Sequence, residues 1–227
     1  MFLMTLVCIV LVSWLIKLSL SQCEATPRGK WGKRWLNCLD KLNTLFCVHF
    51  HRLQFMPIAL PATGPAIVVA NHLSGLDPLL LTAATQRPLR FLIAREEYER
   101  AGFNYLFKAI GCIPVDRVSR PEAALRAALK ALEQGEVIAL YPQGKIVLPH
   151  ELPRKLKKGT LWLAEKSQAP IYPVHLYGIK GMGYIINSLF MRSQARLVTY
   201  PPLTEVQENC LETLQYLLEG RQLQSES

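Results

Sequence analysis

The chain lacks the residue spacings that hold metal ions or build disulfide frameworks. Its six cysteines include no Cys-x2-Cys pair and have no histidine at ligand spacing. No Gly-x-Ser-x-Gly motif is present, which argues against the nucleophile turn of a covalent hydrolase. The sequence also has no internal repeat and no aromatic-basic motif of nucleic-acid-binding proteins. These absences leave no cofactor or metal to predict, and they favour a main domain in a reducing compartment.

What the chain does have is a basic and strongly apolar composition. It has 227 residues, half of them apolar, and 26 lysines and arginines stand against 17 acids, for a formal net charge of +9. This length allows one domain with a sizeable core plus an accessory segment. The positive charge predicts attraction to phosphates or to anionic membrane surfaces.

Residues 1–20 form an almost continuous apolar run whose one charge is Lys17. A run of about 20 apolar residues can span a bilayer as a tilted helix, and it can also be a signal-peptide core. No basic residue precedes the run, whereas four follow it: Arg28, Lys30, Lys33 and Arg34. Under the positive-inside rule this order predicts a membrane-bound protein with the remainder of its chain on the cytoplasmic side.

The following segment has apolar residues at helical spacing. Trp31 and Trp35 stand in its basic first half, and leucines and phenylalanines continue the pattern to Phe50. This is typical of a helix at a membrane interface, or of one packed on the main domain. We therefore expect a membrane anchor and amphipathic helix in residues 1–55 and the main domain in residues 56–227. His49 and His51 are interpreted as polar-face or interface residues.

From residue 57 onward, strand patterns alternate with helical patterns. Strands are expected at residues 66–70, 89–94, 112–115, 136–141, 171–176 and 195–200. Helices are expected at residues 78–85, 95–110, 121–135, 160–168 and 204–218. Alternation of this kind predicts an α/β fold with a largely parallel sheet flanked by helices, in addition to the N-terminal membrane-associated two-helix segment.

The octapeptide NHLSGLDP, residues 71–78, is the most informative part of the chain. It follows the first strand, so His72 is expected at a strand tip. Asp77 precedes Pro78, a pair typical of a helix start, and a carboxylate there would face back toward His72. An Asp-Pro helix start requires no catalysis, but the geometry suits a carboxylate that orients a general base.

NHLSGLDP resembles the His-x4-Asp block of the glycerolipid acyltransferases, the family of the 1-acylglycerol-3-phosphate acyltransferases. GCIPVDR (residues 111–117), YPQGKIV (residues 141–147) and the stretch of residues 157–176 are similar to later blocks of that family, in the same order. The resemblance implies that His72 and Asp77 are catalytic. It implies that Arg117 binds the acceptor phosphate, with Gln143 and Gly144 beside it. In the α/β fold these residues can share one edge of the sheet.

The block at residues 141–147 departs from the family pattern. Gln143 stands where the family usually has glutamate, and Lys145-Ile146 stand where it has Thr-Arg. Glutamine keeps the reach of glutamate but loses its charge, so Gln143 and Lys145 could suit either an anionic acceptor or one without phosphate.

The resemblance implies transfer of a fatty acyl group from acyl-CoA or acyl carrier protein to a lysophospholipid, with 1-acylglycerol 3-phosphate as the expected acceptor and no bound cofactor. Membrane lipids and the acyl carrier are then the partners, and nucleic acid is not. Two alternatives stay open: another lysolipid, amino-lipid or glycolipid acceptor, or a catalytically silent lipid-binding protein of the same fold. The cluster Arg154, Lys155, Lys157 and Lys158 is expected to contact the acyl carrier or the membrane, or to be a solvated face.

Overall fold

A computed structural model describes residues 31–117, 121–148, 151, 155–205 and 209–221 of the chain. Its centre is one seven-stranded sheet in the order β1-β7-β6-β2-β5-β3-β4. Every neighbouring pair is parallel except β6 and β7, which are antiparallel. The strands are β1 (Gln54–Phe55), β2 (Ala66–Ala70), β3 (Leu89–Ala94), β4 (Ile113–Val115), β5 (Val137–Leu140), β6 (Ile171–Tyr177) and β7 (Arg196–Thr199). The expected α/β fold with a largely parallel sheet is confirmed.

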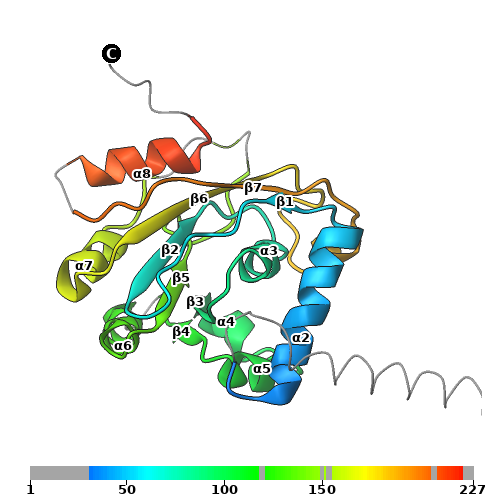
Figure 1. Ribbon diagram of the computed structural model, residues 1–227, viewed down its shortest axis with the longest axis horizontal. Helices are drawn as coiled ribbons and strands as arrows, with labels where there is room; N and C mark the ends of the chain where they lie inside the picture. Colours follow the sequence, from blue (N-terminus) through cyan, green and yellow to red (C-terminus); the bar gives the residue numbers. More distant parts are fainter. Residues whose placement is uncertain (1–30, 118–120, 149–150, 152–154, 206–208, 222–227) are drawn as a thin grey trace, which may run out of the picture.

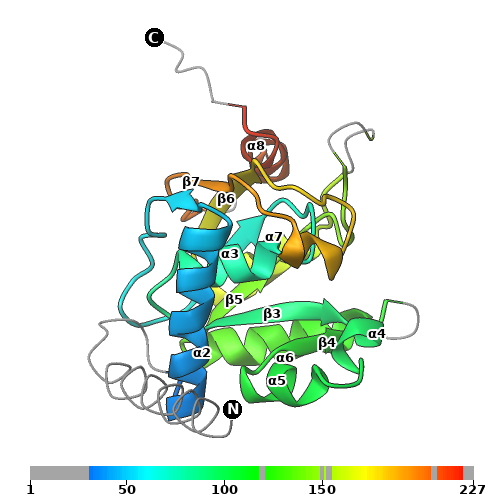
Figure 2. The same ribbon diagram turned by 90° about the vertical axis from the view of Figure 1, so that its right-hand side faces the viewer.

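Helices cover both faces of this sheet (Figure 1). They are α2 (Arg34–Leu45), the π-helical turn η1 (Phe46–Phe50), α3 (Asp77–Ala83), α4 (Arg95–Tyr98), α5 (Asn104–Ala109), α6 (Pro121–Glu133), α7 (Gly159–Ser167), the 3-10 turn η2 (Asn187–Phe190) and α8 (Cys210–Leu218). α2, α3 and α5 lie on one side, and α6, α7 and α8 lie on the other (Figures 1 and 2).

The central strand β2 explains the two layers. All five of its residues are buried, and alternate side chains enter different cores. Val68 belongs to the core that contains Leu80 of α3, whereas Val69 belongs to the core that contains Leu132 of α6. A strand that is apolar at every position must be covered on both faces, as parallel strands in α/β proteins are.

Three elements differ from the sequence-based expectations. The helix expected over residues 95–110 is split into α4 and α5, because Gly102 lies between them with a φ of 87° that a helix cannot contain. α8 begins at Cys210, later than the expected residue 204. β1, which the sequence analysis missed, pairs with β7 and brings residues 54–55 into the sheet. The domain boundary at residue 55 stays a prediction.

The N-terminal segment is described only from Trp31 onward. α2 confirms a helix in the amphipathic segment, and it packs against α3. His51 is not a polar-face residue: its ring is fully buried and lies edge-on to Phe46 and Phe50. Within the described part of the chain, no helix is long and apolar enough to cross a bilayer. The membrane helix expected in residues 1–20 lies outside the described residues.

Candidate active site

The candidate active site lies at the edge of the sheet where the parallel strands end. His72 follows β2, Tyr141 follows β5, and Arg117 follows β4. The register pairs Val69 of β2 with Leu140 of β5, so the two chains leave the sheet side by side. Carboxyl ends of parallel strands are where α/β proteins place their binding sites, and this sheet follows that rule.

His72 and Asp77 form a hydrogen-bonded pair. The Nδ1 atom of His72 lies 2.8 Å from Oδ2 of Asp77, and Asp77 is fully buried at the first position of α3. Because the carboxylate accepts at Nδ1, we assign the imidazole proton to that nitrogen. Nε2 is then the ring nitrogen that can accept a proton from a bound molecule.

Asp77 is held by three further donors. Its Oδ2 atom accepts the backbone N–H groups of Leu73 at 2.6 Å and Ser74 at 2.9 Å, and its Oδ1 atom accepts the Ser74 hydroxyl at 2.9 Å. This network satisfies the buried charge and fixes the turn that carries His72. Asn71 ties the same turn to β6, because its amide donates to the Leu176 carbonyl and accepts the Leu176 N–H.

The ring of Tyr141 lies against the imidazole. The ring centroids of His72 and Tyr141 are 4.1 Å apart with 11° between the planes, and Phe91 lies beyond Tyr141. The Tyr141 hydroxyl is buried and has no hydrogen-bond partner among the described residues. Burial raises the pKa of this phenol well above its ordinary value, so the group stays protonated.

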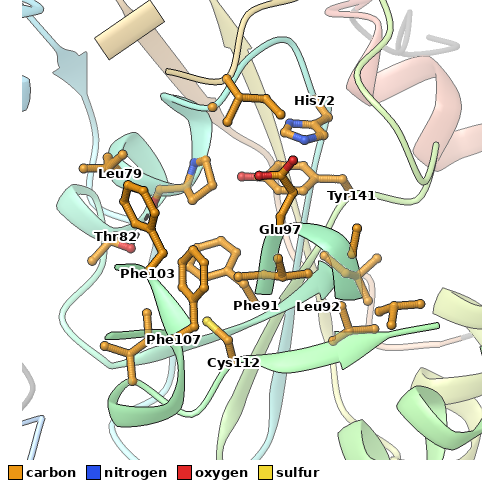
Figure 3. Close-up of a pocket in the computed structure, with 18 of the residues that line it drawn as sticks. His72, Leu79, Thr82, Phe91, Leu92, Glu97, Phe103, Phe107, Cys112 and Tyr141 are labelled. Carbon is orange, nitrogen blue, oxygen red and sulfur yellow. Dashed lines mark hydrogen bonds between the residues drawn. The ribbon is translucent and has the colours of Figure 1, made fainter. Parts of the chain in front are cut away.

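A cavity of about 1100 Å³ opens beside His72. Its walls come from α2, α3, β3, α5 and the segments after β4, β5 and β6. In Figure 3, His72 and Tyr141 lie at one end of this cavity, and Phe107 and Cys112 lie toward the other. Most of the lining side chains are apolar, so the cavity is suited to hydrocarbon.

Cationic side chains belong to the lining of this cavity. Arg117, Lys145 and Lys157 all belong to its lining, as do Gly159 and Thr160 at the N-terminus of α7. Three acids line it too, namely Asp40, Glu96 and Glu97, and Glu97 pairs with Arg100 at 3.2 Å. Positive side chains together with a helix N-terminus form a region suited to an anionic group.

Gly144 brings Lys157 to this site. Its φ is 74°, and a Cβ atom there would lie 2.7 Å from both Cε and Nζ of Lys157. The backbone N–H of Lys157 also donates to the Pro142 carbonyl at 3.0 Å. Glycine at position 144 therefore permits the turn and leaves room for the lysine stem.

The site residues named from the sequence do not all reach the cavity. His72, Arg117, Gly144 and Lys145 line it, and Asp77 lies behind His72. Gln143 is not part of the lining, and its side-chain oxygen is buried with no hydrogen-bond partner among the described residues. Sequence analysis missed Tyr141 as a neighbour of His72, and it placed Lys157 only in a general basic cluster.

Curated relatives match about half of the chain. A probable 1-acyl-sn-glycerol-3-phosphate acyltransferase of Mycoplasma genitalium is 35% identical over 124 residues, which are 52% of this chain and 46% of that protein. An N-acylphosphatidylethanolamine synthase of Arabidopsis thaliana is 30% identical over 126 residues, 51% of this chain and 44% of that protein. The chain spans about half the length of these relatives.

A solved structure and a family model extend the comparison. The 1-acyl-sn-glycerophosphate acyltransferase PlsC of Thermotoga maritima superposes with a TM-score of 0.63 at 19% identity, covering 91% of this chain and 86% of that one. At this identity the likeness shows a shared fold. The acyltransferase family model matches residues 50–177, which is more than half of the 227 residues. The chain therefore belongs to the acyltransferase family.

Proposed function

We propose that this protein transfers a fatty acyl group from acyl-CoA or acyl carrier protein to the free hydroxyl of a lysophospholipid. We further propose 1-acylglycerol 3-phosphate as the acceptor and phosphatidate as the product. The observation that carries the proposal is the His72–Asp77 pair, 2.8 Å apart, at the wall of a large apolar cavity. The name of the Mycoplasma genitalium relative supports the same reaction.

His72 acts as the general base in this mechanism. Nε2 takes the proton of the acceptor hydroxyl while the hydroxyl oxygen attacks the carbonyl carbon of the thioester. The carbon–sulfur bond then breaks, and the imidazolium returns the proton to the leaving sulfur. Asp77 holds the imidazole in the required tautomer and stabilises its positive charge. A positioned base of this kind is worth roughly a hundred- to ten-thousand-fold in rate.

The cavity provides for the apolar part of the substrates. The walls named above are mostly hydrocarbon, and Phe103, Phe107 and Cys112 line the region away from His72. Burial of an acyl chain there removes apolar surface from water, and this favours binding by about 25 cal/mol for each Å² buried. We place an acyl chain in this region, with its carbonyl end at His72.

The cationic region provides for the acceptor head group. Arg117, Lys145 and Lys157 can donate to phosphate oxygens, and the N-terminus of α7 adds a partial positive charge. Lys157 gives this region a cation although Ile146 stands where the family has arginine.

An amino-lipid acceptor is the second candidate function. It is favoured by the Arabidopsis relative, whose name is N-acylphosphatidylethanolamine synthase. The unusual pair Gln143 and Lys145 is compatible with this reading, since both departures fall in the loop next to the cationic region. A silent lipid-binding role is disfavoured by the complete hydrogen-bond network at Asp77.

We also propose that the protein is bound to the membrane with its catalytic domain on the cytoplasmic side. The apolar run of residues 1–20 and the basic residues after it support this placement. The exposed leucines Leu39, Leu42 and Leu45 on α2 give that helix a face for lipid.

The proposal is tested with purified full-length protein in detergent micelles. Acyl-CoA and acyl carrier protein donors are each offered with lysophosphatidate, lysophosphatidylethanolamine, phosphatidylethanolamine and a phosphate-free glycolipid. We expect the highest kcat/KM on lysophosphatidate. Preference for an amino-lipid would replace the acceptor, and absence of transfer to every acceptor from both donors would overturn the enzymatic assignment.

A further inference from the structure

The loop of residues 181–191, between β6 and β7, exposes an unusual amount of apolar surface. Phe190 is 77% exposed and Tyr184 is 57% exposed. Four more large apolar side chains of this loop are exposed: Met182, Ile185, Ile186 and Met191. A water-facing loop normally carries polar residues at such positions, and grouped exposed apolar side chains mark a contact surface.

The backbone of the 181–191 loop is held against the turn that carries the catalytic pair. The N–H of Gly183 donates to the Leu73 carbonyl at 2.8 Å, and the N–H of Gly75 donates to the Tyr184 carbonyl at 3.1 Å. A Cβ at Gly75 would lie 2.2 Å from the Ile185 carbonyl oxygen, so the two segments are in direct contact. The apolar side chains are therefore displayed from an anchored backbone.

The 181–191 loop also forms part of the cavity mouth. Ile185 and Ile186 are exposed and line the cavity at the same time. The other exposed large apolar residues in the lining are Leu39 and Leu42 of α2 and Phe103 before α5. α2 and η2 stand on either side of α3 in Figure 2. Three separate segments thus contribute exposed apolar side chains to the cavity lining.

The charged residues that flank the 181–191 loop in the sequence are all positive. No aspartate or glutamate occurs from Gln168 to Thr204. Lys180 and Arg192 flank the loop, and both are exposed. Apolar side chains bordered by basic ones match an anionic bilayer, where the hydrocarbon enters the interface and the cations meet lipid phosphates.

We propose that the 181–191 loop is a second membrane-contacting element, separate from the N-terminal segment. It inserts Tyr184 and Phe190 into an anionic bilayer and holds the mouth of the cavity against the lipid surface. A lipid acceptor then enters the cavity without crossing water. This inference deepens the proposed function, on which the role of the cavity mouth rests, but the bilayer contact can be measured without activity.

The contact is tested with full-length protein in vesicles of phosphatidylcholine and phosphatidylglycerol brominated in their acyl chains. Phe190→Trp adds one indole to the four that the chain contains. Val198→Trp is the matched control, because Val198 is 37% exposed. Val198 pairs with His175, and the His175 ring is hydrogen-bonded to the Leu218 carbonyl of α8, on the face of the sheet opposite to α2 and α3. Bromine should quench the added emission of Phe190→Trp and leave that of Val198→Trp. Equal added emission of Phe190→Trp, over that of the unaltered protein, in brominated and unbrominated vesicles would overturn the proposal.

A second measurement separates lipid contact from catalysis. Tyr184→Ser/Phe190→Ser should turn over a long-chain acceptor embedded in vesicles at least about tenfold more slowly, since burial of even one of the two large apolar side chains is worth that much. Its rate on a short-chain, water-soluble acceptor should equal that of Val198→Ser and of the unaltered protein. Equal rates on the vesicle acceptor would contradict the proposal. An inactive unaltered protein would overturn the proposed function only, because the quenching result stands by itself. A lipid-free dimer that Phe190→Ser dissociates would assign the loop to a second copy of the chain instead.

Discussion

The imidazole of His72 is stacked on the phenol ring of Tyr141, with 4.1 Å between the centroids. The two residues follow different strands, β2 and β5, which are neighbours in the sheet. Asp77 fixes the imidazole at its Nδ1 edge, and Tyr141 limits its tilt from one face. Stacking and hydrogen bonding together leave Nε2 in a defined direction, as a general base requires.

Substitutions of Tyr141 separate the ring from its hydroxyl. Tyr141→Phe keeps the stack and removes a buried hydroxyl that has no partner among the described residues. We expect near-normal kcat and a free energy of unfolding higher by about 1 kcal/mol. Tyr141→Leu removes the stack and should lower kcat about tenfold, with little change in KM, because orientation of the base is lost. Steady-state kinetics and urea unfolding measure both effects. A large loss of kcat in Tyr141→Phe would instead assign the hydroxyl a direct role.

The catalytic pair is tested by His72→Ala and Asp77→Asn. His72→Ala should lower kcat/KM by roughly a hundred- to ten-thousand-fold while circular dichroism stays unchanged. Asp77→Asn should be impaired in stability as well, since the amide has no charge and only one accepting oxygen, whereas both carboxylate oxygens of Asp77 accept hydrogen bonds. Normal turnover by folded His72→Ala protein would remove the mechanism.

Loss of a cationic side chain from the cationic region should weaken the use of phosphate-bearing acceptors more than that of phosphate-free ones. Arg117→Ala and Lys157→Ala should each raise KM for lysophosphatidate, with a loss of about 1.5 to 3 kcal/mol for a hydrogen bond to a charged group. Lys158→Ala is the control, because Lys158 is exposed and does not line the cavity. The ratio of kcat/KM on phosphate-bearing and phosphate-free acceptors is the measurement. If that ratio is the same in Arg117→Ala, Lys157→Ala and the unaltered protein, this region does not bind the phosphate.

Cys112 offers a test of the acyl-chain region. Its side chain lines the cavity and burial raises its pKa to about 12, so the thiol is an unreactive apolar group at neutral pH. Cys112→Trp should fill part of the cavity and shift donor preference toward shorter acyl chains, whereas Cys112→Ala should leave the preference nearly unchanged. Competition among acyl-CoA donors of different length measures this. An unchanged chain-length profile in Cys112→Trp would place the acyl chain elsewhere.

The fully buried His51 and the half-buried His175 predict a loss of stability in mild acid. Burial lowers the pKa of both His51 and His175 below the ordinary value of about 6.5. The unfolded chain therefore takes up protons first as the pH falls, and the free energy of unfolding should decrease from about pH 6.5 downward until the lowered pKa values are passed. Denaturant unfolding at pH 7 and pH 5 tests this, and His175→Gln should make the decrease smaller. An equal decrease in His175→Gln would exclude His175 as a source.

Short-range features of this protein could be read from the sequence. The strand at residues 66–70, the helix start at Asp77 and the pairing of His72 with Asp77 were all expected, because each depends on residues within a few positions of one another. Alternation of strands and helices was enough to predict the α/β class. The split of the helix over residues 95–110 was missed, because apolar spacing continues across Gly102 and does not reveal its φ.

Only the tertiary structure decided which distant residues meet. The strand order places β5 beside β2, and this adjacency brings Tyr141 onto His72 and the loop after β5 to the cavity. The left-handed turn at Gly144 leaves room for Lys157, which lines the cavity, whereas Gln143 lies outside the cavity lining. Sequence periodicity reports which face of an element is buried, but it does not report which element covers that face. The pairing of strands and the packing of loops supply that information, because they depend on contacts far apart along the chain.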